Sequence, residues 1–200
     1  MTKLPGKIVL ASGNAGKLRE ISRILGDLDI AVVPQSEFGV SDADETGVTF
    51  VENALLKARH AVEATGLPAI ADDSGIAVDA LDGRPGVYSA RYAGPEATDE
   101  DNNERLLAEL AGVPDAERGA AFHCVACFVM PDADEPIVAT GEWRGRILHE
   151  RQGDGGFGYD PLFFDPELGC SSAQLNAEEK NRRSHRGKAL TELGRKLHEL

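Results

Sequence analysis

The stretch from Ile70 to Ile76, which reads Ile-Ala-Asp-Asp-Ser-Gly-Ile, constrains the fold more than any other part of the chain. An apolar run that begins at Leu67 meets two adjacent carboxylates, Asp72 and Asp73, and then Ser74 and a glycine. An apolar run of this length bounded by turn signals predicts a buried strand that ends at the acids. Adjacent carboxylates repel each other, and a divalent cation is one way to offset their burial. The alternative is an acidic turn whose side chains bond local backbone.

Length and charge bound the class of protein. The 200 residues suffice for a sizeable core, and no repeat or linker is recognisable, so we expect a single domain over residues 1–200. A net charge of −13 argues against a basic surface that attracts nucleic acid. No apolar run approaches the roughly 20 residues of a membrane helix, and no secretory signal is present. We therefore expect a cytoplasmic protein with no nucleic acid and no membrane partner.

The three cysteines favour a reducing compartment over a disulfide framework, because the number is small and odd. Cys124 and Cys127 form a C-x-x-C pattern inside a predicted strand, Phe122 to Met130. Residues three apart in a strand point to opposite faces. With only Cys170 elsewhere, a four-cysteine zinc site is impossible, so we expect small core residues.

A polar glycine loop follows the first predicted strand, Lys7 to Ala11. The loop Ser12-Gly13-Asn14-Ala15-Gly16-Lys17 precedes a helix whose apolar side is Leu18, Ile21 and Leu25. Backbone N–H groups at such a helix start form an anion site, and Lys17 adds a positive charge. The spacing does not match a Walker A loop. The alternative is a helix capped by Ser12 or Asn14.

A second helix is predicted from its capping box, Thr49-x-x-Glu52. Its apolar side is expected to be Val51, Leu55, Ala58 and Val62, while Asn53 and Lys57 share another face. Glu45 lies just ahead of this helix and is either a solvated loop acid or a ligand that turns toward a cleft.

Further elements complete the chain. Strands are predicted at Ile30–Val33, at Phe122–Met130 and at Ile137–Trp143, the last two as antiparallel neighbours. Asp79 to Gly94 is expected to be irregular. Thr98 is expected to cap a helix, and a final helix has an inner face of Leu190, Leu193, Leu197 and Leu200.

Two more segments are candidates for ligand binding. Gly153 to Phe164 is rich in glycine, with Phe157 as a flat face for a base and Asp160 as an acceptor, or the aromatic residues simply pack the turn. The second segment is the one strongly basic patch of this acidic chain, which suits either a polyphosphate or a solvated face. It comprises Lys180, Arg182, Arg183, His185, Arg186 and Lys188.

Several collinear motifs together resemble one family. They are Ser-Gly-Asn-Ala-Gly-Lys at 12–17, Glu-Thr-Gly at 45–47, Ala-Asp-Asp-Ser-Gly at 71–75, Pro-Gly-Val-Tyr-Ser-Ala-Arg-Tyr at 85–92, Gly-Gly-Phe-Gly-Tyr-Asp-Pro at 155–161 and Ser-His-Arg at 184–186. From about Lys7 to Leu190 the chain resembles the inosine triphosphatase family, also called the Ham1 or RdgB family, of non-standard purine nucleoside triphosphate pyrophosphatases.

The resemblance implies an α/β fold with a long mixed central sheet, flanking helices and two lobes around a deep active-site cleft. It implies a homodimer. It also implies Mg²⁺-dependent hydrolysis of ITP, dITP, XTP and dXTP to the monophosphate and pyrophosphate, which prevents incorporation of these nucleotides into DNA and RNA.

The resemblance also implies roles for single residues. Asp73 is the expected general base, and Glu45 and Asp73 are the expected Mg²⁺ ligands, with Asp72 close by. The expected substrate contacts are Ser12, Gly13, Asn14, Ala15, Gly16, Lys17, Ser74, Phe157, Gly158, Tyr159, Asp160, Lys180, His185 and Arg186. Hydrolysis also requires cations that stabilise the charge on the phosphate oxygens. Lys17, Lys57 and Lys180 suit this role, and we expect Lys57 to be a catalytic residue. A donor such as Arg186 or His185 aimed at the C6 carbonyl would favour hypoxanthine and xanthine over adenine.

Two other functions stay open at this point. A Maf-type pyrophosphatase would act on pyrimidine or modified nucleotides, and a nucleotide-binding regulatory module would show no turnover. A haloacid-dehalogenase-type phosphatase is disfavoured because its D-x-D motif would need an acid where Ser74 stands.

Overall fold

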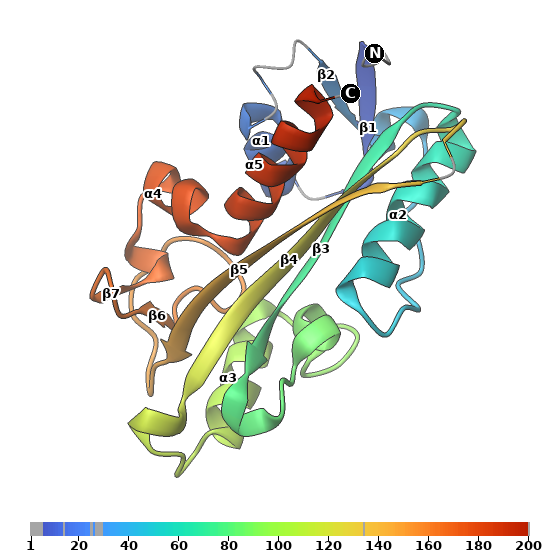
Figure 1. Ribbon diagram of the computed structural model, residues 1–200. Coiled ribbons are helices and arrows are strands. Elements are labelled where there is room, and N and C mark those ends of the chain that lie inside the picture. Colours follow the sequence, from blue (N-terminus) through green and yellow to red (C-terminus); the bar gives the residue numbers. More distant parts are fainter. Residues whose placement is uncertain (1–5, 14, 25, 27–29, 134, 200) are drawn as a thin grey trace. The chain divides into compact units, whose positions relative to one another are not determined.

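The computed structural model describes residues 6–13, 15–24, 26, 30–133 and 135–199. Within these ranges seven strands form one sheet in the order β2-β1-β3-β4-β5-β6-β7 (Figure 1). β1 pairs in parallel with β2 and β3, whereas β6 pairs antiparallel with β5 and β7, so the sheet is mixed as predicted. The strands are β1 (Lys7–Leu10), β2 (Ala31–Pro34), β3 (Ala69–Val78), β4 (Gly119–Val129), β5 (Ile137–Ile147), β6 (Phe163–Asp165) and β7 (Cys170–Ser171).

Five α-helices lie in the described ranges. They are α1 (Ala15–Ile24), α2 (Phe50–Thr65), α3 (Asp99–Glu109), α4 (Ala177–Arg183) and α5 (His185–His198). The predicted capping box of α2 is present, with the Thr49 side chain accepting from the Glu52 N–H. Thr98 caps α3 in the same way. None of these helices is both long enough and apolar enough to cross a bilayer. Leu25 and Leu200, predicted on helix faces, lie outside the described residues.

The chain divides into two compact units. Unit 1 comprises residues 1–73, 124–141 and 185–200, and unit 2 comprises residues 74–123 and 142–184. The unit boundaries fall inside β3, β4 and β5, so each of these strands supplies residues to both units.

In unit 1 the strand pleat sorts alternate residues into two apolar layers. Ile8, Ile70 and Cys124 pack with Leu190 and Leu193 of α5. Their strand neighbours belong to the other layer, with the alanines of α2 (Figure 1). Cys124 and Cys127 therefore lie in different layers, as their spacing predicted, and both are buried free thiols.

The buried face of α2 only partly matches the predicted one, since Ala58 is buried and Leu55 and Val62 are partly buried against the same cluster. Ala54, Ala58 and Ala61 are fully buried, whereas Val51 is 38% exposed. These alanines pack on Ala69 and Ala71 of β3 and on other strand residues, as one small-residue contact. Small side chains on α2 and β3 let the helix lie close to the sheet. The larger apolar side chains of α2 therefore lie at the margins of this contact.

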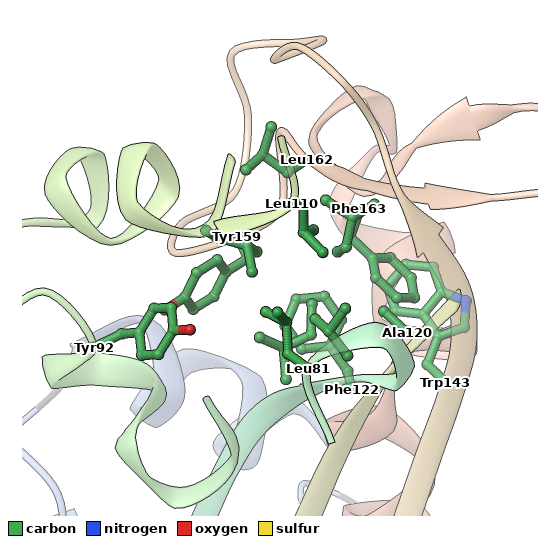
Figure 2. Packing of buried hydrophobic residues seen from close by; sticks show 13 residues of the cluster. Leu81, Tyr92, Leu110, Ala120, Phe122, Trp143, Tyr159, Leu162 and Phe163 are labelled. Carbon is green, nitrogen blue, oxygen red and sulfur yellow. The ribbon is translucent and has the colours of Figure 1, made fainter. Parts of the chain in front are cut away.

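The core of unit 2 is aromatic. Phe122, Trp143 and Phe163 meet with ring centroids 4.6 to 6.4 Å apart (Figure 2). Tyr92 and Tyr159 belong to the same cluster. The predicted irregular region after β3 contains two short 3-10 helices, η3 (Asp79–Leu81) and η4 (Gly86–Arg91).

One predicted boundary is wrong in a way that matters for function. β3 does not end at Asp72 but continues through both acids to Val78. β5 likewise continues past Trp143 to Ile147. The two carboxylates therefore stand inside a strand, where successive side chains point to opposite faces.

Candidate active site

The two adjacent acids of β3 have separate partners. Asp72 pairs with Lys17 of α1 and Arg186 of α5, at 2.9 and 3.1 Å. Asp73 contacts Asn53 and Lys57, both from α2. This division follows from the strand pleat, which turns neighbouring side chains to opposite faces. Each of the two carboxylates therefore has its own cationic partners within the protein.

The Asp73 cluster consists of Glu45, Asn53, Lys57 and Asp73. Lys57 Nζ lies 2.7 Å from Glu45 Oε1 and 3.0 Å from Asp73 Oδ1. Asn53 Nδ2 donates to Asp73 Oδ2 at 3.2 Å, and Asn53 Oδ1 accepts from the Gly47 N–H at 2.8 Å. The Asn53 amide thus joins the 45–47 segment to the carboxylate. A side chain at Gly47 would place its Cβ 2.6 Å from Asn53 Oδ1, so glycine is required for this approach.

Burial and charge act in opposite directions in this cluster. Burial raises the pKa of Asp73 above its ordinary value, and the opposing effect of Lys57 does not cancel the rise. Burial acts to lower the pKa of Lys57, but attraction to Asp73 and Glu45 outweighs it and raises that pKa. Lys57 therefore stays protonated between its two carboxylate partners, and Asp73 is a more basic carboxylate than an exposed aspartate.

The donor set of the Asp73 cluster fits Mg²⁺. Glu45 and Asp73 each present an oxygen to one positive charge, the Lys57 ammonium. Mg²⁺ usually binds proteins through one or two carboxylates and completes its shell with water and substrate phosphates. No group of three or more His, Cys, Asp or Glu side chains that could hold a metal ion is found within the described ranges.

The Asp72 cluster consists of Lys17, Asp72 and Arg186. Burial acts to raise the pKa of Asp72, but Lys17 and Arg186 outweigh it and hold that pKa well below its ordinary value. Arg186 is only 4% exposed, although a solvated basic face was the default expectation for its segment. The carboxylate fixes both cations, which the resemblance assigned to the substrate.

The predicted glycine loop joins β1 to α1, as the sequence indicated. The Ala11 N–H donates to Ile70 O at 2.8 Å, so the start of the loop is held beside β3. α1 begins at Ala15, and Lys17 lies in its first turn. Asn14 lies outside the described residues.

In unit 2, Asp160 organises the glycine-rich segment. Its Oδ2 accepts from the Phe157 N–H at 2.8 Å and from Lys180 Nζ, and its Oδ1 accepts from Ser172 Oγ at 2.7 Å. Gly156 has φ +77°, and a Cβ there would lie 2.1 Å from Asp160 Oδ2. Asp160, predicted as an acceptor for a ligand, is thus a buried acceptor for donors of the protein itself, from its own loop and from Ser172 and Lys180.

Phe157 is the exposed aromatic ring of this segment. It is 46% exposed, and Lys180 Nζ lies 4.8 Å from its ring centroid. Tyr159, in contrast, is buried in the aromatic core, and its hydroxyl donates to Ser89 O at 2.8 Å (Figure 2).

The predicted residues therefore form three groups, two in unit 1 and one in unit 2. Unit 1 brings together Glu45, Lys57 and Asp73, and separately Lys17, Asp72 and Arg186. Unit 2 brings together Phe157, Asp160 and Lys180. His185 is buried at the start of α5, and Ser74 is half-buried in β3.

Asn53 is the residue of this site that the sequence analysis did not include among its candidates. The sequence does contain a pattern that could have identified Asn53, because Asn53 and Lys57 are four residues apart and share one face of α2. Only the tertiary structure shows that this face meets Asp73.

Comparison with known proteins identifies the family. The model of the Ham1 family matches residues 8–196. The chain belongs to the Ham1 family. Among Ham1 relatives, a dITP/XTP pyrophosphatase of Pectobacterium atrosepticum is 58% identical over 185 residues, covering 92% of this chain and 94% of the relative. A dITP/XTP pyrophosphatase of Vibrio parahaemolyticus is 58% identical over 188 residues, covering 94% of each.

Solved Ham1 structures share the fold. A HAM1 protein from Coxiella burnetii matches with a TM-score of 0.91 and 48% identity, covering 97% of this chain and 99% of that one. The Ham1 protein of Staphylococcus aureus matches with a TM-score of 0.88 and 43% identity, covering 96% and 98%. The recognised family and the α/β fold are confirmed.

Proposed function

We propose that this Ham1 protein hydrolyses non-standard purine nucleoside triphosphates, namely dITP, XTP, ITP and dXTP, to the monophosphate and pyrophosphate. Relatives at 58% identity over nearly the whole chain are dITP/XTP pyrophosphatases. The observation that carries the proposal to specific residues is the Asp73 cluster, in which a buried carboxylate, a second acid, an amide and a held lysine meet. Removal of these nucleotides prevents their incorporation into DNA and RNA.

Asp73 is the proposed general base. The attacking water forms a bond to phosphorus, the α–β phosphoanhydride bond breaks, and the proton of the water passes to the Asp73 carboxylate. The raised pKa of Asp73 supports this role, because a carboxylate with a pKa nearer neutrality accepts a proton more readily. Asn53 keeps Oδ2 oriented while Lys57 sits at Oδ1.

Glu45 and Asp73 are the proposed ligands of Mg²⁺. Bound Mg²⁺ would neutralise phosphate charge and would lower the pKa of a water molecule that it binds. Asp72 is not proposed as a ligand, because Lys17 and Arg186 already hold its charge. Asp44, the sequence neighbour of Glu45, is not proposed as a ligand either, because Glu45 is the acid that binds Lys57.

The remaining predicted contacts divide between phosphate and base. Ser12 to Lys17, Lys57 and Lys180 are proposed to bind the triphosphate, through backbone N–H groups and positive charge. Phe157 is proposed to stack on the purine. Arg186 or His185 is proposed to donate to the C6 carbonyl, and the buried pair with Asp72 supports a fixed guanidinium rather than a mobile one.

We further propose a homodimer in a reducing cytoplasm. The three free cysteines in the described ranges, two of them buried, support the reducing compartment.

A steady-state assay with pyrophosphate detection tests the function. A panel of XTP, ITP, dITP, dXTP, ATP, GTP, CTP and UTP should give pyrophosphate from the first four with Mg²⁺ present. Asp73→Asn should abolish this turnover. Orthophosphate as the primary product, preference for pyrimidines, or nucleotide binding without turnover would each contradict the proposal.

A further inference from the structure

The backbone on both sides of the exposed Phe157 ring is fully held. The Phe157 N–H donates to Asp160 Oδ2 at 2.8 Å, and Phe157 O accepts from the Asp160 N–H at 3.3 Å. The next residue, Gly158, has φ +59°, a conformation that favours glycine. A Cβ at Gly158 would meet nothing within 4 Å, so backbone conformation rather than space requires the glycine.

Both polar groups of Gly158 are bound by the first turns of α3. The Gly158 N–H donates to Asp99 Oδ2 at 2.6 Å, and Gly158 O accepts from Asn103 Nδ2 at 2.8 Å. Asp99 and Asn103 are one helical turn apart, and Asn103 Nδ2 also donates to Asp99 O at 2.8 Å. One face of α3 therefore forms a two-point clamp on a single residue of the glycine-rich segment.

The burial of Asn103 indicates that its donor group is what the site uses. Asn103 is 3% exposed, and its Oδ1 has no hydrogen-bond partner among the described residues. A buried acceptor without a partner costs free energy that an apolar side chain of similar size would avoid. The Asn103 amide thus acts through its Nδ2, which donates to Gly158 O and to Asp99 O.

We propose that Asp99 and Asn103 are positioning residues for substrate, which fix the Phe157 ring as a platform for the purine. This inference rests on the proposed contact between Phe157 and the base. Stacking on an aromatic ring contributes to base affinity, and a ring fixed before binding does not lose freedom when the base arrives. Loss of the clamp weakens substrate binding while the Asp73 chemistry is unchanged.

The test is a double-mutant cycle between Asn103→Leu and Phe157→Ala, read as KM and kcat for XTP. Asn103→Leu should raise KM about 3- to 10-fold, the effect of one hydrogen bond, with kcat within about 2-fold. In the Phe157→Ala background the same substitution should change KM less than about 2-fold, because linked residues are not additive.

Asn102→Ala is the matched control. Asn102 is equally buried on α3 and makes two hydrogen bonds, but to Ala90 O and the Ala93 N–H instead of Gly158. Asn102→Ala should lower stability, because two hydrogen bonds are lost, and should leave KM unchanged.

Two outcomes would overturn the inference in different ways. If Phe157→Ala raises KM but Asn103→Leu does not, the clamp has no role in binding, and if the two effects multiply, Asn103 does not act through the Phe157 ring. In both cases the proposed base contact stands. If Phe157→Ala leaves KM unchanged, the base contact itself is wrong and the positioning role falls with it.

Discussion

Asp72 and Asp73 are adjacent in sequence, yet replacement by asparagine should lower stability at Asp72 and should not lower it at Asp73. Asp72→Asn keeps the volume but leaves Lys17 and Arg186 without their counter-ion, and the Arg186 side chain is only 5% exposed. Removing one partner of a buried ion pair costs ~3–5 kcal/mol. For a chain of this length that corresponds to a fall in Tm of roughly 6–20 °C.

Asp73→Asn should leave Tm unchanged or raise it by a few degrees. The folded-state pKa of Asp73 is raised, so its charge costs stability at every pH above its unfolded pKa of about 3.9. Asparagine removes that cost, and Lys57 keeps Glu45 as a partner at 2.7 Å. The depressed pKa of Asp72 has the opposite consequence, because its contribution is present above pH ~3.9 and is lost as the pH falls further.

Thermal unfolding at pH 7, followed by circular dichroism, measures both variants beside Asp79→Asn. Asp79 pairs with Arg144 at 3.1 Å, but both side chains are more than half exposed. Such surface pairs contribute ~0–1 kcal/mol, so this control should stay near the parent Tm. Equal Tm changes in Asp72→Asn and Asp73→Asn, or a neutral Asp72→Asn, would refute the assignment of the two acids to opposite faces.

Three further predictions follow from the same geometry. Asn53→Ala should lower kcat for XTP about tenfold, since the Asp73 carboxylate loses one oriented partner; a change confined to KM would contradict this. Gly156→Ala should unfold the glycine-rich segment, because its Cβ would lie 2.1 Å from Asp160 Oδ2, while Gly158→Ala should cost only ~1–2 kcal/mol in urea unfolding. Chelation of Mg²⁺ should abolish pyrophosphate release but leave the Tm of the substrate-free protein unchanged; a large fall in Tm would indicate a structural metal instead.

Local signals in the sequence predicted local structure well. The capping box at Thr49 fixes the start of α2, because two side chains and two backbone N–H groups pair reciprocally there. The four-residue spacing of Asn53 and Lys57 placed them on one helix face, and both contact Asp73. The three-residue spacing of Cys124 and Cys127 likewise predicted that they point to opposite faces of β4.

Contacts between distant segments were not predictable in the same way. The sequence around Asp72 gives turn signals, yet β3 continues through the acids because Lys17 and Arg186 offset the buried charge from elsewhere in the chain. Arg186 is 114 residues from Asp72, and nothing in its basic neighbourhood distinguishes it from solvated arginines. The composition of the glycine-rich segment suggested Phe157 as a face for a base and Asp160 as an acceptor, but the clamp of α3 on Gly158 had no sequence signal that we recognised.

The two buried thiols of unit 1, Cys124 and Cys127, can report how that unit opens. Burial raises the pKa of Cys127 to about 12 and raises that of Cys124 as well, so neither is a ready nucleophile while its layer is intact. Iodoacetamide should therefore alkylate Cys124 only when α5 detaches from the strands, and Cys127 only when α2 does. Mass spectrometry of the two modified peptides would report which helix leaves first, with the half-buried Cys170 as the reference for reagent access in unit 2.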